Sequence, residues 1–168
     1  EQLPYRLARQ DGPAPLIFII AGTGVNYSSG KPELLKQLFY GAGYHVVQLS
    51  SPTSFDFITA ASSNATPGNS MADAEDLYAV MEAIKARHSD LAVTEYHLTG
   101  YSLGALNSAF ISQLDETRQT FNFSRVLMIN PPVSLLTSVG NLDSLSEVQV
   151  RDDGKPPSFD GLFKRLAE

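Results

Sequence analysis

The sequence predicts an α/β fold in which a mostly parallel sheet is covered by helices on both faces. Two observations carry this prediction. Short apolar runs typical of strands alternate along the chain with segments of helical periodicity, and the run at residues 16–20 is continuously apolar and rich in β-branched residues. A continuous apolar run is typical of a strand buried on both faces, and strands that alternate with helices favour a parallel sheet.

Short apolar runs locate the expected strands. The first run, near the N-terminus, suits an edge strand, and an Asp-Gly-Pro turn follows it. The last run ends in Asn130-Pro131-Pro132, because proline cannot continue a central strand. The expected strands lie at residues 5–9, 16–20, 46–49, 96–98 and 124–129.

Apolar residues three and four positions apart predict three helices between these strands. Pro32 suits the first turn of the first helix, and Ser70-Met71-Ala72-Asp73 has the spacing of a capping box at the start of the second. Residues 50–70, rich in small polar residues, are expected to form a long loop. The apolar faces are expected to comprise Leu34, Leu35, Leu38 and Phe39; Ala74, Leu77, Tyr78, Met81 and Ile84; and Leu103, Leu106, Phe110 and Leu114.

Composition excludes several classes of function. The chain has 168 residues, a net charge of −6 and no lysine or arginine cluster, which argues against a nucleic-acid partner. It has no cysteine, so thiol catalysis, disulfides and cysteine-based metal sites are excluded. No apolar run approaches the ~18 residues of a membrane span. The compartment stays open, and an export signal removed before Glu1 is one alternative.

The most informative motif is Gly100-Tyr101-Ser102-Leu103-Gly104, a G-x-S-x-G sequence between an expected strand and an expected helix. A sharp strand-to-helix turn exposes the serine hydroxyl and requires small neighbours. The first amides of the helix then lie beside the serine, where they stabilise negative charge. Gly22-Thr23-Gly24 follows the strand at 16–20, so both segments are expected at the carboxyl edge of the sheet, where ligands bind in such folds.

Together with Ala21-Gly22-Thr23-Gly24, this motif resembles the α/β-hydrolase superfamily over residues 1–135. The resemblance implies that Ser102 is an acyl nucleophile, and that the backbone N–H groups of Thr23 and Leu103 are oxyanion-hole donors. Ala21 stands where histidine is common in the family, which leaves the backbone donor unchanged. No metal or organic cofactor is implied. Further candidate site-lining residues are Gly22, Gly24, Asn26 and Tyr101.

The partners of the serine are not found. In the superfamily an acid and then a histidine follow the nucleophile, but His45, His88 and His97 all precede Ser102. We expect structural roles for all three, and no acid is assigned; Asp115 and Glu116 are expected to end a helix away from the site. The chain is therefore expected to be the amino-terminal part of a larger hydrolase and to lack the last strands of the sheet. Residues 136–168 are expected to begin a cap or lid. Alone, it is expected to be nearly inactive.

Three alternatives remain open at this point. A non-catalytic binding protein on the same fold predicts no serine reactivity, even in a longer chain. A nucleotide site is disfavoured because Tyr27 stands where a dinucleotide fingerprint needs glycine, and Pro32 replaces the Ser/Thr of a P-loop. A thioesterase, acyltransferase or peptidase would use the same turn. The expected partners are a small acyl substrate and the remainder of the same polypeptide.

Overall fold

The computed structural model describes residues 3–141, and the chain divides into two compact units, Glu1–Pro131 and Pro132–Glu168. Within the second unit, the Ser138 amide donates to the Ser134 carbonyl at 2.9 Å, as in a helical turn. The expected cap or lid lies largely outside the described residues. Five acidic residues that follow Ser102 and were candidates for its acid partner also lie outside them: Asp143, Glu147, Asp152, Asp153 and Asp160.

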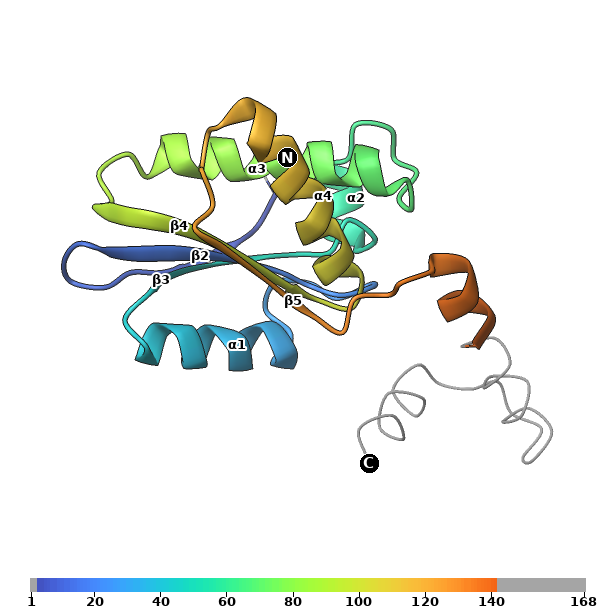
Figure 1. Cartoon of the computed structure of the whole chain (residues 1–168), viewed down its shortest axis with the longest axis horizontal. Coiled ribbons are helices and arrows are strands. Elements are labelled where there is room, and N and C mark those ends of the chain that lie inside the picture. Colours follow the sequence, from blue (N-terminus) through green and yellow to red (C-terminus); the bar gives the residue numbers. More distant parts are fainter. Residues whose placement is uncertain (1–2, 142–168) are drawn as a thin grey trace. The chain divides into compact units, whose positions relative to one another are not determined.

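The first unit is built on a five-stranded sheet with the order β1-β3-β2-β4-β5 (Figure 1). Every neighbouring pair is parallel except β1 and β3, which are antiparallel. This confirms the predicted mostly parallel sheet with the N-terminal strand at its edge. The strands are β1 (Arg6–Ala8), β2 (Ala14–Ile20), β3 (His45–Leu49), β4 (Val93–Tyr101) and β5 (Arg125–Ile129).

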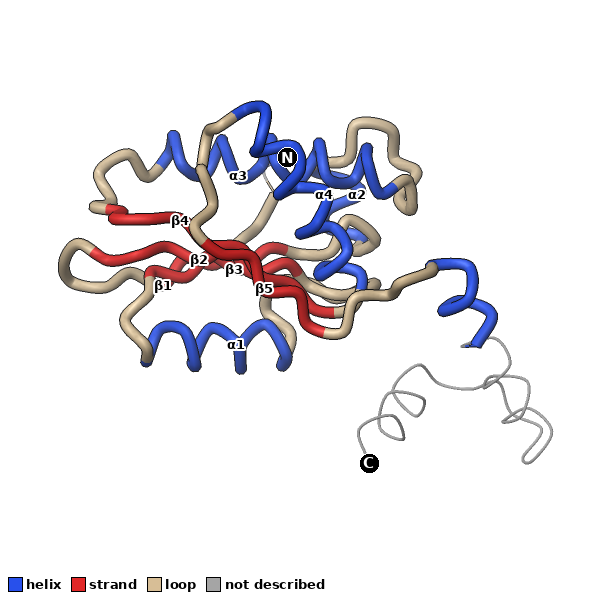
Figure 2. Tube along the Cα trace, viewed as in Figure 1, coloured by secondary structure: helices blue, strands red, loops and turns tan. Residues whose placement is uncertain are grey.

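Helices cover both faces of the sheet, as Figure 2 shows with helices in blue and strands in red. Helix α1 (Gly30–Gly41) lies on one face, and α3 (Ser70–Arg87) and α4 (Leu103–Arg118) lie on the other. The expectation of an uninterrupted loop at residues 50–70 is wrong, because α2 (Phe55–Ala60) forms within it. Its single fully buried side chain, Phe57, fixes it to the core, and six residues are too few to show a periodic pattern.

The main core lies between the sheet and the α3/α4 layer. All five residues predicted for the apolar stripe of α3 are buried there, from Ala74 to Ile84. The helix begins at Ser70, but its cap differs from the predicted capping box. The Asn69 side chain accepts from the Ala72 amide at 3.3 Å, and Asp73 reaches back to accept from the Gly68 amide at 2.9 Å. An Asn at the cap position performs the role expected of Ser70.

The expected apolar faces of α1 and α4 are partly wrong. Leu34 and Leu38 are 57% and 60% exposed, because the sheet side of α1 is taken by Leu35 and Phe39. On α4, Leu103 is buried and Phe110 and Leu114 are half-buried against the main core, as expected, whereas Leu106 is half-buried outside that core and Ile111, which was not predicted, is fully buried. Helical periodicity marks an apolar side of a helix, but the partner that covers it decides which residues are buried.

Strand β5 is the other edge of the described sheet. Its residues Leu127 and Met128 are each about half exposed, although residues 126–129 are all apolar. Among residues 3–141, no helix has both the length and the apolar character that crossing a bilayer requires.

Candidate functional site

The G-x-S-x-G segment forms the tight junction between β4 and α4. Ser102 has φ +54° and ψ −124°, a conformation that residues other than glycine rarely adopt. Its amide donates to the Ile129 carbonyl at the end of β5 (2.9 Å), and its own carbonyl accepts from the Ala105 amide (3.0 Å). The residue is nevertheless exposed. A strained residue that the surrounding backbone holds in place is characteristic of a functional position.

Both glycines of the motif are required by the close approach of backbone atoms. A Cβ atom at Gly100 would lie 2.2 Å from the carbonyl oxygen of Gly104. A Cβ atom at Gly104 would lie 2.2 Å from the carbonyl oxygen of Ile20 and 2.6 Å from that of Ala21. The first turn of α4 therefore packs directly on the carboxyl end of β2, where the second glycine-containing segment begins.

The Gly22-Thr23-Gly24 segment lies against the same junction. A Cβ atom at Gly22 would approach Cε2 of the Tyr101 ring to 2.8 Å, so the segment packs on that ring. The Gly22 carbonyl accepts from the Val25 amide at 3.0 Å, which fixes the peptide group that joins residues 22 and 23. In a trans peptide the N–H points opposite to the C=O, so the Thr23 N–H points out of the turn.

Leu103 supplies a second outward-facing donor. It is the first residue of α4, so no carbonyl of its own helix can accept from its amide. It directly follows Ser102, and the positive end of the helix dipole lies at this point. The predicted donor residues, Thr23 and Leu103, thus lie on two segments that touch through Gly22, Tyr101 and Gly104.

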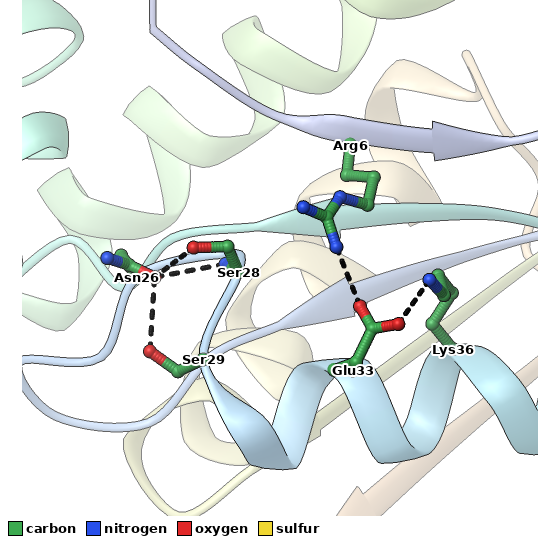
Figure 3. Close-up of polar contacts among 6 residues, drawn as sticks. All are labelled: Arg6, Asn26, Ser28, Ser29, Glu33 and Lys36. Atoms are coloured by element: carbon green, nitrogen blue, oxygen red, sulfur yellow. Dashed lines mark hydrogen bonds and ion pairs between the residues drawn. The ribbon is translucent and has the colours of Figure 1, made fainter.

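The candidate lining residues Tyr101 and Asn26 serve the framework of the site. Tyr101 is buried, and burial raises the pKa of its phenol, so the ring is neutral and forms a wall beneath Gly22. The Asn26 Oδ1 atom accepts from the Ser28 amide (3.0 Å), the Ser28 hydroxyl (3.0 Å) and the Ser29 hydroxyl (3.1 Å), as Figure 3 shows. Asn26 therefore shapes the turn that leads into α1.

Figure 3 also shows how α1 is tied to the sheet edge. Glu33 accepts from Arg6 of β1 at 2.8 Å and also pairs with Lys36 one turn further along the helix. The hydrogen bond from Lys36, together with Arg6, holds the pKa of the Glu33 carboxyl below its usual value. These are surface contacts that orient α1 rather than groups that face Ser102.

None of the three histidines is placed to act as a base on Ser102. His97 lies in β4 five residues before it, about 16 Å along a strand, and its ring packs against Tyr44 at 5.3 Å between centroids. His45 pairs across the sheet with Leu16, which in turn pairs with Tyr96 of β4. Tyr96 lies six residues before Ser102, so His45 is level with a point about 20 Å from the serine along β4. Each therefore has the structural placement that the sequence suggested.

His88 lies still further from Ser102. It caps the end of α3, before the start of a nine-residue strand that spans about 30 Å on its way to the site. Its Nε2 atom lies 2.7 Å from the Tyr5 hydroxyl, so the N-terminal segment holds the ring. Its role is to join α3 to the segment before β1.

Of the two acids near the end of α4, Glu116 is exposed and Asp115 is structural. Asp115 is buried and accepts from the Tyr78 hydroxyl (2.6 Å), the Phe121 amide (3.0 Å) and the Phe123 amide (3.2 Å). Burial and the bond to Asp115 raise the pKa of Tyr78. Within residues 3–141, no group of three or more His, Asp or Glu side chains is arranged to hold a metal ion.

Comparison with known proteins gives structural neighbours only. No family model matches the sequence, and no curated protein matches it. Among solved structures, the chain is similar to brefeldin A esterase, a bacterial homologue of human hormone-sensitive lipase, with a TM-score of 0.58 at 16% identity. It is also similar to BpoC of Mycobacterium tuberculosis, described as a non-heme bromoperoxidase, with a TM-score of 0.58 at 17% identity.

The chain has the α/β-hydrolase fold. The alignments cover 84% and 94% of this chain but only 41% and 51% of the two neighbours, so the chain spans about half of their length or less. Dienelactone hydrolase from Anabaena variabilis is also similar, with a TM-score of 0.50 at 14% identity, over 83% of this chain and 88% of that one. At these identities the likeness extends to the fold, and the chemistry has to be argued from the site.

Proposed function

We propose that this chain carries the nucleophile and oxyanion hole of a serine hydrolase that cleaves ester or thioester bonds. The observation that supports it most strongly is the strained, exposed Ser102 at the β4–α4 junction. The amides of Thr23 and Leu103 border this junction. The three structural neighbours belong to the same fold class, two of them an esterase and a hydrolase by name.

The proposed reaction has two steps. Ser102 Oγ attacks the substrate carbonyl carbon and transfers its proton to a base, and the alcohol or thiol leaves with that proton. The carbonyl oxygen becomes negative in the tetrahedral intermediate, where the Thr23 and Leu103 amides donate to it. Each such donor is worth about 3–4 kcal/mol of barrier. Water, deprotonated by the same base, then attacks the acyl-serine, and the carboxylic acid is released.

The base in this proposal is an imidazole from a part of the polypeptide outside this sequence. The histidines of this sequence are too distant for this role, because His45, His88 and His97 lie about 16 Å or more along strands from Ser102. The alignments cover only 41% and 51% of two of the neighbours, which supports further strands outside this sequence, although they cover 88% of dienelactone hydrolase. This chain alone should accordingly turn over substrate poorly, whereas the complete gene product should be active.

Hydrolysis of p-nitrophenyl acetate, butyrate and octanoate by the complete gene product tests the proposal. We expect turnover that falls by about 10³-fold or more in Ser102→Ala, because the nucleophile is lost. The matched control is Ser89→Ala, an exposed serine beyond the end of α3, which should retain wild-type rates. Turnover that survives in Ser102→Ala would refute the assignment.

The alternative is a binding protein that keeps the fold without the chemistry. The distance of all three histidines from Ser102 is the observation that favours it. Under both proposals, Ser102→Ala can still bind acyl compounds. The two proposals differ in the acyl-serine, which the wild-type hydrolase forms and the binding protein does not.

A further inference from the structure

Residues 50–56, which comprise the loop after β3 and the start of α2, hold the segment that bears the Thr23 amide through a set of hydroxyl groups. The Gly24 amide donates to the Thr53 hydroxyl at 2.7 Å, and the Thr53 hydroxyl lies 2.9 Å from that of Ser51. The Ser51 amide in turn donates to the Val25 carbonyl at 2.9 Å. These contacts connect the two loops at both of the residues that follow Thr23.

A second pair of contacts fixes the far end of the same segment. The Tyr27 amide donates to the Ser50 hydroxyl at 3.0 Å, and the Ser50 hydroxyl donates to Asp56 Oδ2 at 2.6 Å. Ser50 and Ser51 are fully buried, so their positions are fixed by the core at the end of β3. We call Ser50, Ser51, Thr53 and Asp56 the hydroxyl clamp.

The clamp acts on the peptide group next to the proposed oxyanion donor. The Gly22 carbonyl, bonded to Val25, orients the peptide group that contains the Thr23 N–H. The Thr53 hydroxyl orients the following one, through the Gly24 amide. Gly24 has φ +69°, and because glycine has no Cβ atom its own sterics do little to hold the backbone at this angle. Without Thr53, the peptide group that joins Thr23 and Gly24 would be held only through its neighbours, by the bonds that Val25 makes to Gly22 and Ser51.

We propose that Thr53 is a positioning residue that sets the direction of the Thr23 oxyanion donor. This inference rests on the proposed function of Ser102 and Thr23. It predicts a small effect on folding, because the Gly24–Thr53 contact is exposed and water can replace the lost hydroxyl. It predicts a larger effect on the chemical step, because oxyanion donors act on charge that develops only in the transition state.

The test compares Thr53→Val, Thr53→Ser and Thr59→Val in the complete gene product. Thr53→Val removes the acceptor at nearly constant volume, and Thr53→Ser retains it. Thr59→Val is the matched control, because among residues 3–141 the Thr59 hydroxyl bonds only within α2, to the Phe55 and Asp56 carbonyls. Each variant is labelled with a fluorophosphonate. In this reaction Ser102 Oγ forms a bond to phosphorus, fluoride leaves, and the hydroxyl proton passes to the base.

We expect Thr53→Val to lower the maximal labelling rate about 10- to 100-fold, the loss typical of a misplaced group, with little change in the probe concentration at half-maximal rate. Thr53→Ser and Thr59→Val should label like wild type. Hydrogen exchange measured by NMR supplies a readout without chemistry: the Gly24 amide should exchange about tenfold faster in Thr53→Val and unchanged in Thr59→Val.

Each outcome decides a different claim. If wild type labels at Ser102 and Thr53→Val labels at the same rate, the positioning role is refuted while the proposed function stands. An unchanged Gly24 exchange rate in Thr53→Val refutes the clamp itself, whatever the labelling shows. If wild type does not label at Ser102, the proposed function is refuted and the catalytic role of Thr53 with it.

Discussion

Gly104→Ala probes the contact between the first turn of α4 and the end of β2. The added Cβ atom would lie 2.2 Å from the Ile20 carbonyl oxygen, 2.6 Å from the Ala21 carbonyl oxygen and 2.8 Å from the Ile20 carbonyl carbon. All three are backbone atoms, so no side-chain rotation relieves the overlap. Either α4 or β2 has to move.

The loss in the free energy of unfolding depends on how far the backbone of α4 or β2 has to move. Overpacking of a core costs about 1–3 kcal/mol and more where backbone is displaced, so we expect a loss of about 3 kcal/mol or more in the free energy of unfolding. In a chain of this size that lowers Tm by about 10 °C. The same displacement separates Ser102 from the Thr23 segment, so labelling of Ser102 should slow more than the stability loss alone explains.

Thermal and urea unfolding followed by circular dichroism measure the effect, with Gly41→Ala as the matched control. Gly41 ends α1, and a Cβ atom there meets nothing within 4 Å. The control should be neutral or stabilising by about 0.5 kcal/mol, because alanine restricts the unfolded chain. If Gly104→Ala unfolds at the wild-type temperature, α4 does not pack on β2 as described and the reasoning fails.

Three further predictions concern Ser102, Asp115 and Asp73. Ser102→Gly should raise the free energy of unfolding by about 1–2 kcal/mol, because glycine relieves the strain at φ +54°, whereas Ser102→Ala should be near neutral; denaturant titration would contradict this if the two variants matched. Asp115→Ala should lower it by about 3 kcal/mol or more, because the buried Phe121 amide and its neighbours lose their acceptor; a loss below about 1 kcal/mol would show that water replaces the carboxylate. Burial raises the pKa of the Asp73 carboxyl, so the native state binds the carboxyl proton more tightly than the unfolded chain does. The stability that comes from the neutral carboxyl is therefore fully present below the unfolded pKa and is lost as pH rises through the native pKa. Asp73→Asn should therefore gain stability over wild type as pH rises from about 4 to 7, and a gap in melting temperature that is constant with pH would contradict this.

The sequence was most informative where local geometry admits one solution. Gly100 and Gly104 could be recognised because their spacing about a serine requires small residues, and the structure places backbone atoms 2.2 Å from a Cβ at each. The strand at 16–20 was recognisable because a strand buried on both faces needs a continuous apolar run. In both cases the pattern depends on neighbours close in sequence.

Features set by distant partners could not be predicted in the same way. Leu34 and Leu38 belong to the apolar pattern of α1 but are exposed, because the sheet takes only the side that bears Leu35 and Phe39. Asp115 carries no motif; its bonds to Tyr78 and to the amides after α4 arise only on folding.

The hydrogen bonds of the hydroxyl clamp could not be predicted for a related reason. Serines and threonines after β3 are typical of any polar loop, and the sequence does not show which amides they accept from. A cluster of hydroxyl residues immediately after a buried parallel strand was the available signal, since that position lies at the edge of the sheet where sites form.

Reaction with a fluorophosphonate, followed by the mass of the complete gene product and the sequence of the modified peptide, shows directly whether Ser102 is a reactive nucleophile. We expect one adduct per chain, on Ser102, which is absent in Ser102→Ala and formed at the wild-type rate in Ser89→Ala. Modification of another residue, or no adduct on Ser102 in folded protein, would contradict the claim that the β4–α4 junction holds a reactive nucleophile.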